Sequence, residues 1–196
     1  MKKILVLAPH CDDEIWCAGY IAKMIEEGNE VYYIAFTYLS DTDLFKEETE
    51  SIKILKIKYV GTEDFRVRDF PVFRQNILQI MADLRDELKP DIVLCPSTQD
   101  FHQDHKVITE EAIRAFKHST ILGYECIWNN LELKGQCTVE LTESQLNKKI
   151  EVMKCYKSQA HRPYMNEDFI RSWAKMRGVQ NGCEYAEVFE VIKLRL

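Results

Sequence analysis

The stretch "KKILVLAPHCDDEIWCAGYIAKMIEEGNEVYYIAFTYL", residues 2–39, decides the fold of this chain. It opens with a short apolar run, residues 2–7, and ends with another, residues 30–39; such runs are typical of strands buried on both faces of a parallel sheet. Between the two runs, apolar residues recur at helical spacing over residues 14–28, and Gly28 closes that segment. The stretch therefore predicts a strand, a crossover helix and a second strand parallel to the first.

The same alternation continues along the rest of the 196 residues. Further helices are predicted at 43–57, 73–88, 104–118, 143–158 and 166–177, and further strands within 58–67 and at 91–96, 120–125, 137–142 and 185–196. A chain of this length fits one domain with a proper core and is short for two. We expect a single domain over residues 1–196, in the α/β class, with a Rossmann-like, mostly parallel sheet and helices on both faces.

Composition and charge narrow the functional class. The formal net charge of −6 argues against binding to nucleic acid, and no stretch is apolar and long enough to span a membrane. The opening apolar run stops at acidic residues, unlike a signal peptide. The seven cysteines are odd in number and contain no CxxC pair, so they are typical of reduced thiols. We expect a cytoplasmic protein that binds a small molecule.

Two polar clusters follow predicted strands at the points where those strands end. "APHCDDE", residues 8–14, comes after the first strand, and "STQDFHQDH", residues 97–105, comes after the strand at 91–96. The carboxyl ends of parallel strands share one edge of a sheet, and ligands bind at that edge near the switch in strand order. The two clusters are therefore expected to face each other across one crevice.

The residue types in the two clusters are those of a metal site. His10 and Asp13 are three residues apart, about one helical turn, and His102 and His105 have the same spacing. Two imidazoles and a carboxylate are a usual ligand set for a catalytic metal that keeps open positions. This set suits zinc and also iron(II), and the residues alone do not choose between them.

Helix capping is the simpler interpretation of the acids in each cluster. Asp12 suits the N-cap of the first helix, with Asp13 and Glu14 favouring its positive end, and Asp104 suits the cap of the later helix. Capping, however, explains none of the histidines at 10, 102 and 105. The two clusters together therefore favour the metal site.

In these residues the chain resembles the PIG-L or LmbE-like zinc-dependent de-N-acetylases. The AHPDDE signature of that family has its counterpart in "PHCDDE", and the HxDH signature in "HQDH". The similarity extends to "KPDIVLCPS" and to the late "RGVQNGCEYAEVFEV", and so runs through most of the chain. The departures are Pro9, Cys11, and Asp100 where some members have a tyrosine, which leaves the source of one oxyanion contact open.

The resemblance implies an LmbE-like fold, a zinc cofactor and a role for each motif residue. His10, Asp13 and His105 are expected to hold the metal. Asp12 is expected to act as general base and His102 as the acid facing the leaving amine, with Asp104 orienting His102. The implied reaction is removal of an N-acetyl group from an N-acetylated amino sugar or its glycoconjugate, by water that the metal activates.

The sequence identifies the residues that contact substrate less clearly than the metal ligands. Arg68 and Arg177 are candidates for binding a phosphate or carboxylate, although a solvated surface is the better explanation for most of the arginines and lysines in these segments. Trp128 and Asn129 offer an aromatic face and an amide that suit a sugar, and core packing is an equally good account of Trp128.

Three other classes of protein share some of these features. A receiver domain would need an aspartate where the strand at 91–96 has Cys95 and Pro96, and a dinucleotide-binding module would need a glycine-rich turn after the first strand. Both are excluded. A catalytically inactive metal- or sugar-binding relative stays as the alternative, and the sugar, the native metal and the oligomeric state stay open.

Overall fold

The strand–helix–strand unit that opens the chain is present in the computed structural model, which describes residues 1–37, 42–132 and 134–195. β1 (Lys3–Ala8) leads into a short 3₁₀ helix η1 (Asp13–Cys17), then α1 (Ala18–Glu26) and β2 (Glu30–Ala35). The predicted helix is thus divided into a short 3₁₀ helix and an α-helix. The predicted second strand ends at Ala35, and its residues 38–39 lie outside the described part of the chain.

The other predicted elements are present, with ends that differ by a few residues. They are α2 (Asp43–Leu55), β3 (Lys58–Thr62), α3 (Arg74–Leu88), β4 (Ile92–Pro96), α4 (Gln103–Ala115), β5 (Thr120–Tyr124), β6 (Cys137–Leu141), α5 (Glu143–Cys155), α6 (Glu167–Asn181) and β7 (Tyr185–Lys193). Two short 3₁₀ helices, η2 (Phe70–Val72) and η3 (Lys157–Gln159), were not predicted. The largest difference is in α6, which continues past the predicted end at 177. It stops where Gly182 takes a left-handed conformation, φ 76°, that glycine adopts without strain.

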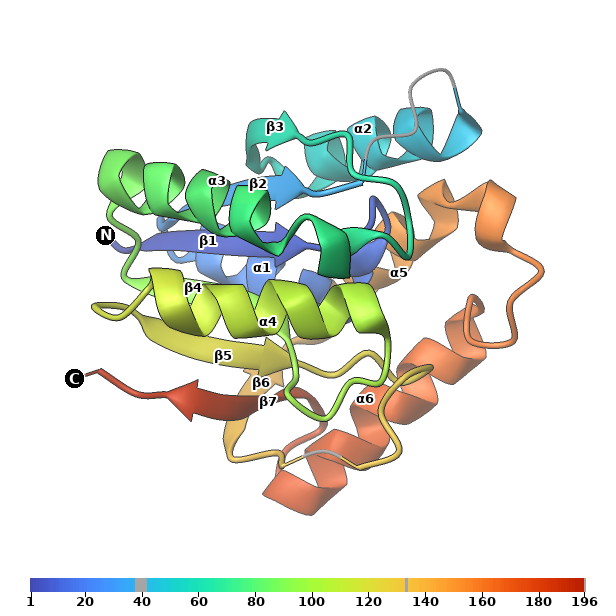
Figure 1. Cartoon of the computed structure of the whole chain (residues 1–196). Helices are drawn as coiled ribbons and strands as arrows, with labels where there is room; N and C mark the ends of the chain where they lie inside the picture. Colours follow the sequence, from blue (N-terminus) through green and yellow to red (C-terminus); the bar gives the residue numbers. More distant parts are fainter. Residues whose placement is uncertain (38–41, 133, 196) are drawn as a thin grey trace.

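One seven-stranded sheet carries these strands in the order β3-β2-β1-β4-β5-β7-β6. Neighbours from β3 to β5 pair in parallel, whereas β7 runs antiparallel to both β5 and β6, as the arrows in Figure 1 show. The predicted α/β fold with a mostly parallel sheet is confirmed. The strand order reverses between β1 and β4, which places the crevice of the sheet between the ends of these two strands.

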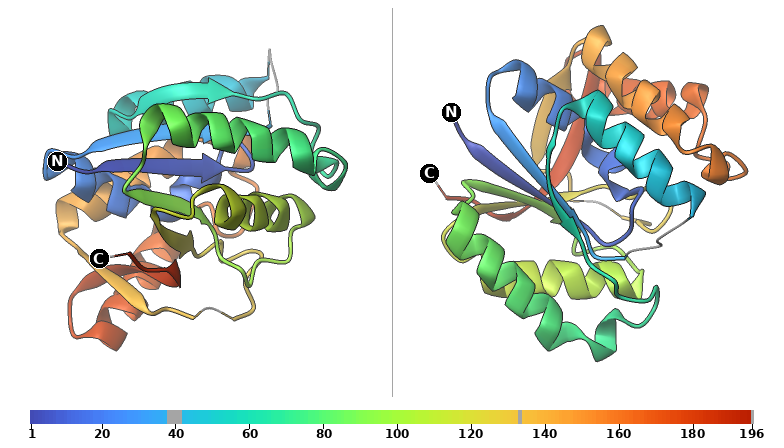
Figure 2. Two further views of the ribbon diagram at one scale, coloured as in Figure 1. Left: turned by 60° about the vertical axis from the view of Figure 1, so that its left-hand side comes forward. Right: turned by 90° about the horizontal axis from the view of Figure 1, so that it is seen from above.

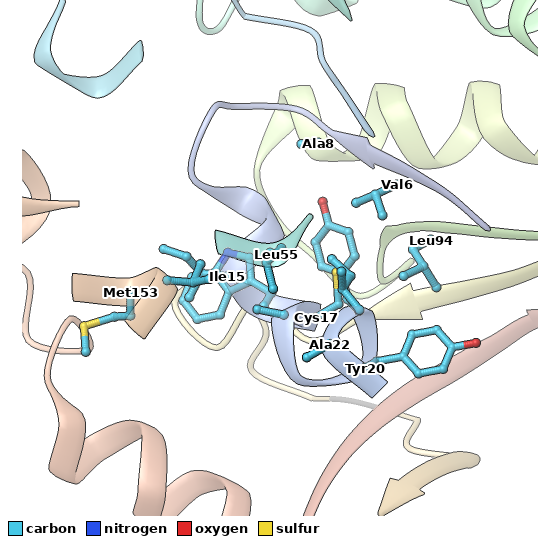
Figure 3. Packing of buried hydrophobic residues seen from close by; sticks show 14 of the residues in the cluster. Val6, Ala8, Ile15, Cys17, Tyr20, Ala22, Leu55, Leu94 and Met153 are labelled. Atoms are coloured by element: carbon cyan, nitrogen blue, oxygen red, sulfur yellow. The ribbon is translucent and has the colours of Figure 1, made fainter. Parts of the chain in front are cut away.

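Helices cover both faces of the sheet because successive residues of a buried strand point to opposite sides. On one face Leu5 and Leu7 of β1 pack with α3 and α4, and on the other Ile4 and Val6 pack with α1, α2, α5 and α6. Figure 2 shows the two helical layers with the sheet between them. Figure 3 shows part of the second layer, in which Val6 and Leu94 of the sheet lie beside Cys17 and the start of α1.

Over the described residues, no helix is long and apolar enough to cross a bilayer.

Candidate active site

The two polar clusters meet at the reversal of strand order. The first follows β1 and the second follows β4, and these strands are hydrogen-bonded neighbours in the sheet. A cavity of about 320 Å³ opens at this edge. Its wall includes residues of both clusters, namely His10, Asp12, Asp13, His102 and His105.

His10, Asp13 and His105 bring one ligand atom each to a common point. Asp13 Oδ2 lies 3.3 Å from His10 Nδ1 and 3.4 Å from His105 Nε2, and the two ring nitrogens are 3.3 Å apart. Nitrogen and oxygen ligands bind zinc at about 2.0–2.1 Å, so the ligand atoms of a tetrahedral site are about 3.3 Å apart. The three side chains therefore fit a divalent cation of this size without rearrangement.

Each of these two histidines is held from behind by a carboxylate. His105 Nδ1 lies 2.7 Å from Asp100 Oδ2, and His10 Nε2 lies 3.2 Å from Asp104 Oδ2. A carboxylate on one ring nitrogen fixes the tautomer that presents the other nitrogen to a metal. Both histidines are thus oriented as ligands.

The partner of Asp104 differs from the one expected. Its carboxylate was expected to orient His102, but Oδ2 lies 3.9 Å from His102 Nδ1 and instead contacts His10 Nε2 and accepts the backbone N–H of Arg68 at 2.6 Å. Asp104 does not cap α4 either, because the N-cap is His102, whose Nδ1 accepts the Asp104 N–H. The side chain of Asp104 therefore contacts the candidate ligand His10, and its hydrogen bond with His102 is made by its backbone N–H.

Asp100 was not assigned a role from the sequence. It is fully buried, and its second oxygen accepts the backbone N–H of His102 at 2.8 Å. A carboxylate buried in this way, touching both histidines of the HxDH motif, holds part of the candidate metal site in place. The sequence offered no sign of this beyond the departure from tyrosine.

Two further donors lie near the three ligand atoms. A ring nitrogen of His102 lies within 4.8 Å of those of His10 and His105, and Cys126 Sγ lies within 4.8 Å of ligand atoms of Asp13 and His105. Neither belongs to the set of three atoms 3.3–3.4 Å apart, so His10, Asp13 and His105 remain the best-matched set.

Asp12 stands at the N-cap position of η1 without capping it. Its side chain makes no capping hydrogen bond, and it lines the cavity beside the candidate ligands. Burial, and then the negative charge of Asp13, raise the pKa of Asp12. A raised pKa makes a carboxylate a better proton acceptor, which suits a general base.

The pKa values of the three candidate ligands are shifted strongly by their surroundings. Burial lowers the pKa of both histidines, but nearby carboxylates outweigh it and raise the pKa of His10 to about 9 and that of His105 to about 10. Burial raises the pKa of Asp13, yet the two histidines hold it well below its usual range. Without a metal, protons on the imidazoles balance the carboxylates, and a cation would replace those protons.

His102 differs from the other two histidines. Burial, followed by the charges of His105 and His10, lowers its pKa. Because Nδ1 accepts the N–H of Asp104, the proton of the neutral ring is assigned to Nε2. His102 can therefore donate a hydrogen bond into the cavity without carrying a charge.

Glu14 is more than a helix-starting acid. Its side chain is fully buried and accepts hydrogen bonds from Ser51 and Tyr156, and burial raises its pKa to about 8. Tyr156 also donates to the carbonyl of Cys11 at 2.8 Å. Through Tyr156, Glu14 thus helps to hold the loop between β1 and η1 in place, and it does not belong to the cavity wall.

Three of the four predicted substrate residues line the cavity. Arg68, Trp128 and Asn129 belong to its wall. Trp128 is 57% exposed, which excludes the core-packing interpretation. Arg177 does not line the cavity and is instead ion-paired with the buried carboxylate of Glu125. This prediction for Arg177 is corrected.

Other parts of the cavity wall were not predicted. Gln159, Arg162 and Tyr164 reach it from the connection between α5 and α6, and Trp16 reaches it from η1. The Tyr164 ring lies 5.3 Å from both the Trp16 and the Trp128 rings, so the three form one aromatic side of the cavity. No motif in the sequence marks these residues, because their approach depends on how α5 and α6 pack.

Comparison with known proteins identifies one family and many similar folds. The PIG-L family, described as GlcNAc-PI de-N-acetylase, matches residues 5–116, which is more than half of the chain and includes both polar clusters. Among curated proteins, no sequence matches this chain.

Three solved structures illustrate the range of proteins with this fold. N,N'-diacetylchitobiose deacetylase from Pyrococcus horikoshii, in complex with its inhibitor MPG, is 24% identical, with a TM-score of 0.78 over 97% of this chain and 84% of that chain. GalB, the 4-carboxy-2-hydroxymuconate hydratase from Pseudomonas putida KT2440, is 20% identical, with a TM-score of 0.79 over 100% of this chain and 98% of that chain. The zinc inhibited form of teicoplanin deacetylase Orf2 is 15% identical, with a TM-score of 0.74 over 95% and 96%. At these identities the likeness establishes the fold alone, and a hydratase among them shows that the fold does not determine the reaction.

Proposed function

Because the chain belongs to the PIG-L family of GlcNAc-PI de-N-acetylases, we propose that it is a metal-dependent hydrolase that removes an N-acetyl group from an amino sugar or its glycoconjugate. The observation that carries this proposal is the convergence of His10 Nδ1, Asp13 Oδ2 and His105 Nε2 at 3.3–3.4 Å from one another. Asp12 lies beside them in the same cavity without a capping role.

His10, Asp13 and His105 would hold the cation. Zinc is the first choice, by the family, and iron(II) suits the same donors. Such a cation supplies a Lewis acid that polarises the acetamide carbonyl and lowers the pKa of the attacking water. Zinc is named as inhibitory in one protein of this fold, so the metal is best added stoichiometrically rather than in excess.

The chain's own residues then handle the protons. Asp12 takes a proton from the attacking water while the water oxygen bonds to the acetyl carbon. His102 donates a hydrogen bond from Nε2 to the carbonyl oxygen as negative charge develops there. The carbon–nitrogen bond then breaks, and the amine leaves with a proton that the side chains of Asp12 and His102 can deliver. Acetate and a free amino sugar are the products.

The cavity wall suits a sugar next to the acetamide. Trp128 and Tyr164 offer aromatic faces to the apolar side of a sugar ring, and Asn129 and Arg68 offer polar groups to its hydroxyls. Asp104 and Asp100 would keep the ligand histidines in place during the reaction.

The test compares two neighbouring acids with different proposed jobs. The protein, loaded with one equivalent of zinc or iron(II), is assayed for free amine against a panel of N-acetylated amino sugars and glycoconjugates. Asp12→Asn should keep the metal and lose about 10²–10⁴-fold in kcat. Asp13→Asn should lose both metal and activity.

Other outcomes would overturn the proposal or part of it. A metal-loaded Asp12→Asn variant with near wild-type kcat would remove Asp12 from the reaction. Tight metal binding without turnover of any N-acetyl sugar would favour the alternative, an inactive metal- or sugar-binding relative.

A further inference from the structure

Arginines without an acidic partner gather in the candidate active site. Six of the nine arginines have a carboxylate oxygen within 4.0 Å. The three that have none within the described residues are Arg68, Arg162 and Arg195. The cavity wall includes Arg68 and Arg162, whereas Arg195 lies at the opposite edge of the sheet. Because acids outnumber bases in this chain, two unpaired guanidinium groups in one cavity call for an explanation.

The contacts of Arg162 hold its guanidinium group in place without neutralising it. Arg162 is half-buried, its Nε donates to Gln159 Oε1 at 2.7 Å, and its guanidinium carbon lies 6.0 Å from the centre of the Tyr164 ring. Gln159 and Tyr164 also line the cavity. The neighbouring Ser158 is anchored to α2 by two hydrogen bonds to the carboxylate of Glu47. The arginine is thus held by the neutral side chains of Gln159 and Tyr164, and the charge of Asp12 acts on it only from beyond ion-pair distance. A guanidinium group held in this way favours recognition of an external anion.

Arg68 has an unusual backbone conformation beside the metal centre. Its φ is 75°, a region that favours glycine, and its backbone N–H donates to Asp104 Oδ2 at 2.6 Å. Asp104 in turn contacts the ligand His10. Lys56 and Lys89 also have positive φ, but they end helices, whereas Arg68 lies in a connection beside the candidate active site, where such backbone conformations cluster. The arrangement ties the Arg68 backbone to the support of His10 and leaves its side chain in the cavity wall.

The charge balance of the cavity follows from its wall. Asp12 and Asp13 contribute two negative charges, and Arg68 and Arg162 contribute two positive ones. Asp100 and Asp104, which lie behind the ligand histidines, add two further negative charges. A divalent cation held by His10, Asp13 and His105 would, together with the two arginines, balance these four carboxylates, in a protein whose net charge is −6. Because Asp100 and Asp104 are absent from the cavity wall, the groups that face a ligand would still carry an excess of positive charge, which favours an anionic ligand.

We propose that the substrate carries an anionic group, a carboxylate or a phosphate, in addition to its N-acetyl group, and that Arg162, assisted by Arg68, binds that group. This rests on the proposed deacetylase function and narrows it to acidic amino-sugar derivatives. The planar guanidinium of Arg162 suits bidentate binding of either anion. Trp128 and Tyr164 would then contact the sugar between the anion and the acetamide.

The test compares sugars that share the acetamide and differ in charge. The probes are N-acetylglucosamine, its 1-phosphate and 6-phosphate, and N-acetylglucosaminuronic acid. We expect kcat/KM for at least one charged sugar to exceed that for N-acetylglucosamine by about 10- to 100-fold, as charge-assisted hydrogen bonds predict. The phosphate and carboxylate probes distinguish the two anions. Arg162→Gln should remove most of that preference, mainly through KM, and Arg162→Lys should retain part of it.

The matched control is Arg66→Gln. Arg66 lies two residues before Arg68 on the same connection, its side chain is 87% exposed, and it is absent from the cavity wall. This substitution removes the same charge from the protein and should leave the preference for charged sugars intact.

Four results would overturn the inference. The first is equal kcat/KM for charged and uncharged sugars, which leaves the deacetylase function standing. The second is an equal loss of kcat on both kinds of sugar in Arg162→Gln. The third is a preference that survives in the Arg68→Gln, Arg162→Gln double variant, because the anion would then bind the metal. If no probe is turned over, calorimetry measures the affinity of each sugar for the metal-loaded Asp12→Asn protein. The fourth contradicting result is that no charged sugar binds more tightly than N-acetylglucosamine in this experiment.

Discussion

The imidazoles of His10 and His105 each have one nitrogen on a carboxylate and the other at the proposed metal site. For His105 the carboxylate is Asp100, at 2.7 Å, and for His10 it is Asp104, at 3.2 Å. The carboxylate that binds one ring nitrogen fixes the orientation and the tautomer of the ring, and so determines which nitrogen faces the proposed metal site. The ligand geometry therefore depends on two buried acids that need not touch the metal.

Asp100→Asn should weaken metal binding with little change in side-chain volume. An amide cannot match the charge of the carboxylate on His105 Nδ1, and loss of such a partner typically costs about 10–100-fold in metal affinity. The dissociation constant is measured by competition with a chelator. Asp83→Asn, at an exposed position on α3, should bind the metal as wild type does. Wild-type affinity in Asp100→Asn would show that the Asp100 contact does not support the site.

Metal binding should release protons and strengthen with pH. In the metal-free protein the pKa of His10 is about 9 and that of His105 about 10, so both rings are protonated at neutral pH. A metal ligand must be neutral, so at pH 7 one cation should displace about two protons. Apparent affinity should then rise by up to about 100-fold per pH unit and level off as the pH passes these pKa values.

Calorimetric titration in buffers of different ionisation enthalpy counts the released protons. His102→Ala should release the same number, because the pKa of His102 is lowered and its ring is neutral at pH 7. Release of no protons at pH 7 would contradict the charge state assigned to His10 and His105.

At the scale of elements, β7 supports both motif loops with buried glutamates. Glu187 accepts the N–H groups of Gly19 and Tyr20 at the start of α1, which follows the first motif. Glu190 accepts hydrogen bonds from the Ser97 hydroxyl at 2.9 Å and from the Thr98 N–H at 2.7 Å, where the loop of the second motif begins. The antiparallel strand thus has a function in the site, although it contributes no residue to the cavity wall.

Lys149→Met should destabilise the protein strongly. Lys149 is buried, lies 2.6 Å from Glu187 and donates to the carbonyl of Trp16 at 3.1 Å. Removing one partner of a buried pair leaves the other charge uncompensated and typically costs about 3–5 kcal/mol. The free energy of unfolding is measured by urea denaturation.

The neighbouring Lys148 provides the control. Its pair with Glu151 is on the surface, where ion pairs contribute little, so Lys148→Met should leave the unfolding free energy nearly unchanged. Adding Glu187→Gln to Lys149→Met should recover part of the loss, because the uncompensated charge is then removed as well. Equal stabilities of the Lys148 and Lys149 variants would refute this role of the buried pair.

At the scale of the whole molecule, the proposed metal centre joins segments that are distant in the chain. His10 follows β1 and His105 lies in the first turn of α4, and the two meet only in the folded state. A ligand that binds the folded state alone stabilises it by about 2.7 kcal/mol at one hundred times its dissociation constant. For a chain of this length that corresponds to a rise of about 5–10 °C in Tm.

Thermal unfolding with and without metal checks this expectation. His105→Ala should lose the metal-dependent rise in Tm, whereas His118→Ala, near the opposite edge of the sheet, should keep it. A similar rise in both variants would place the metal elsewhere.

Much of the fold was predictable because it depends on residues close together in the sequence. Apolar runs and helical spacing predicted the strands and helices to within a few residues, and the two polar clusters predicted where the crevice lies. The division of the first helix into η1 and α1 was not predicted. It places Asp13 in a tighter turn, where Asp13 Oδ2 accepts the backbone N–H of His10 at 2.8 Å.

By itself the sequence determined the α/β alternation, the position of His10, Asp13 and His105 after strands, and the resemblance to one family. Only the tertiary structure decided the partners of these residues. It paired Asp104 with His10 rather than His102, brought Arg162 and not Arg177 to the cavity, and buried Asp100 against His105. The reason is physical: strand and helix periodicity acts over a few residues, whereas these contacts depend on how helices pack across a sheet, where distant segments meet.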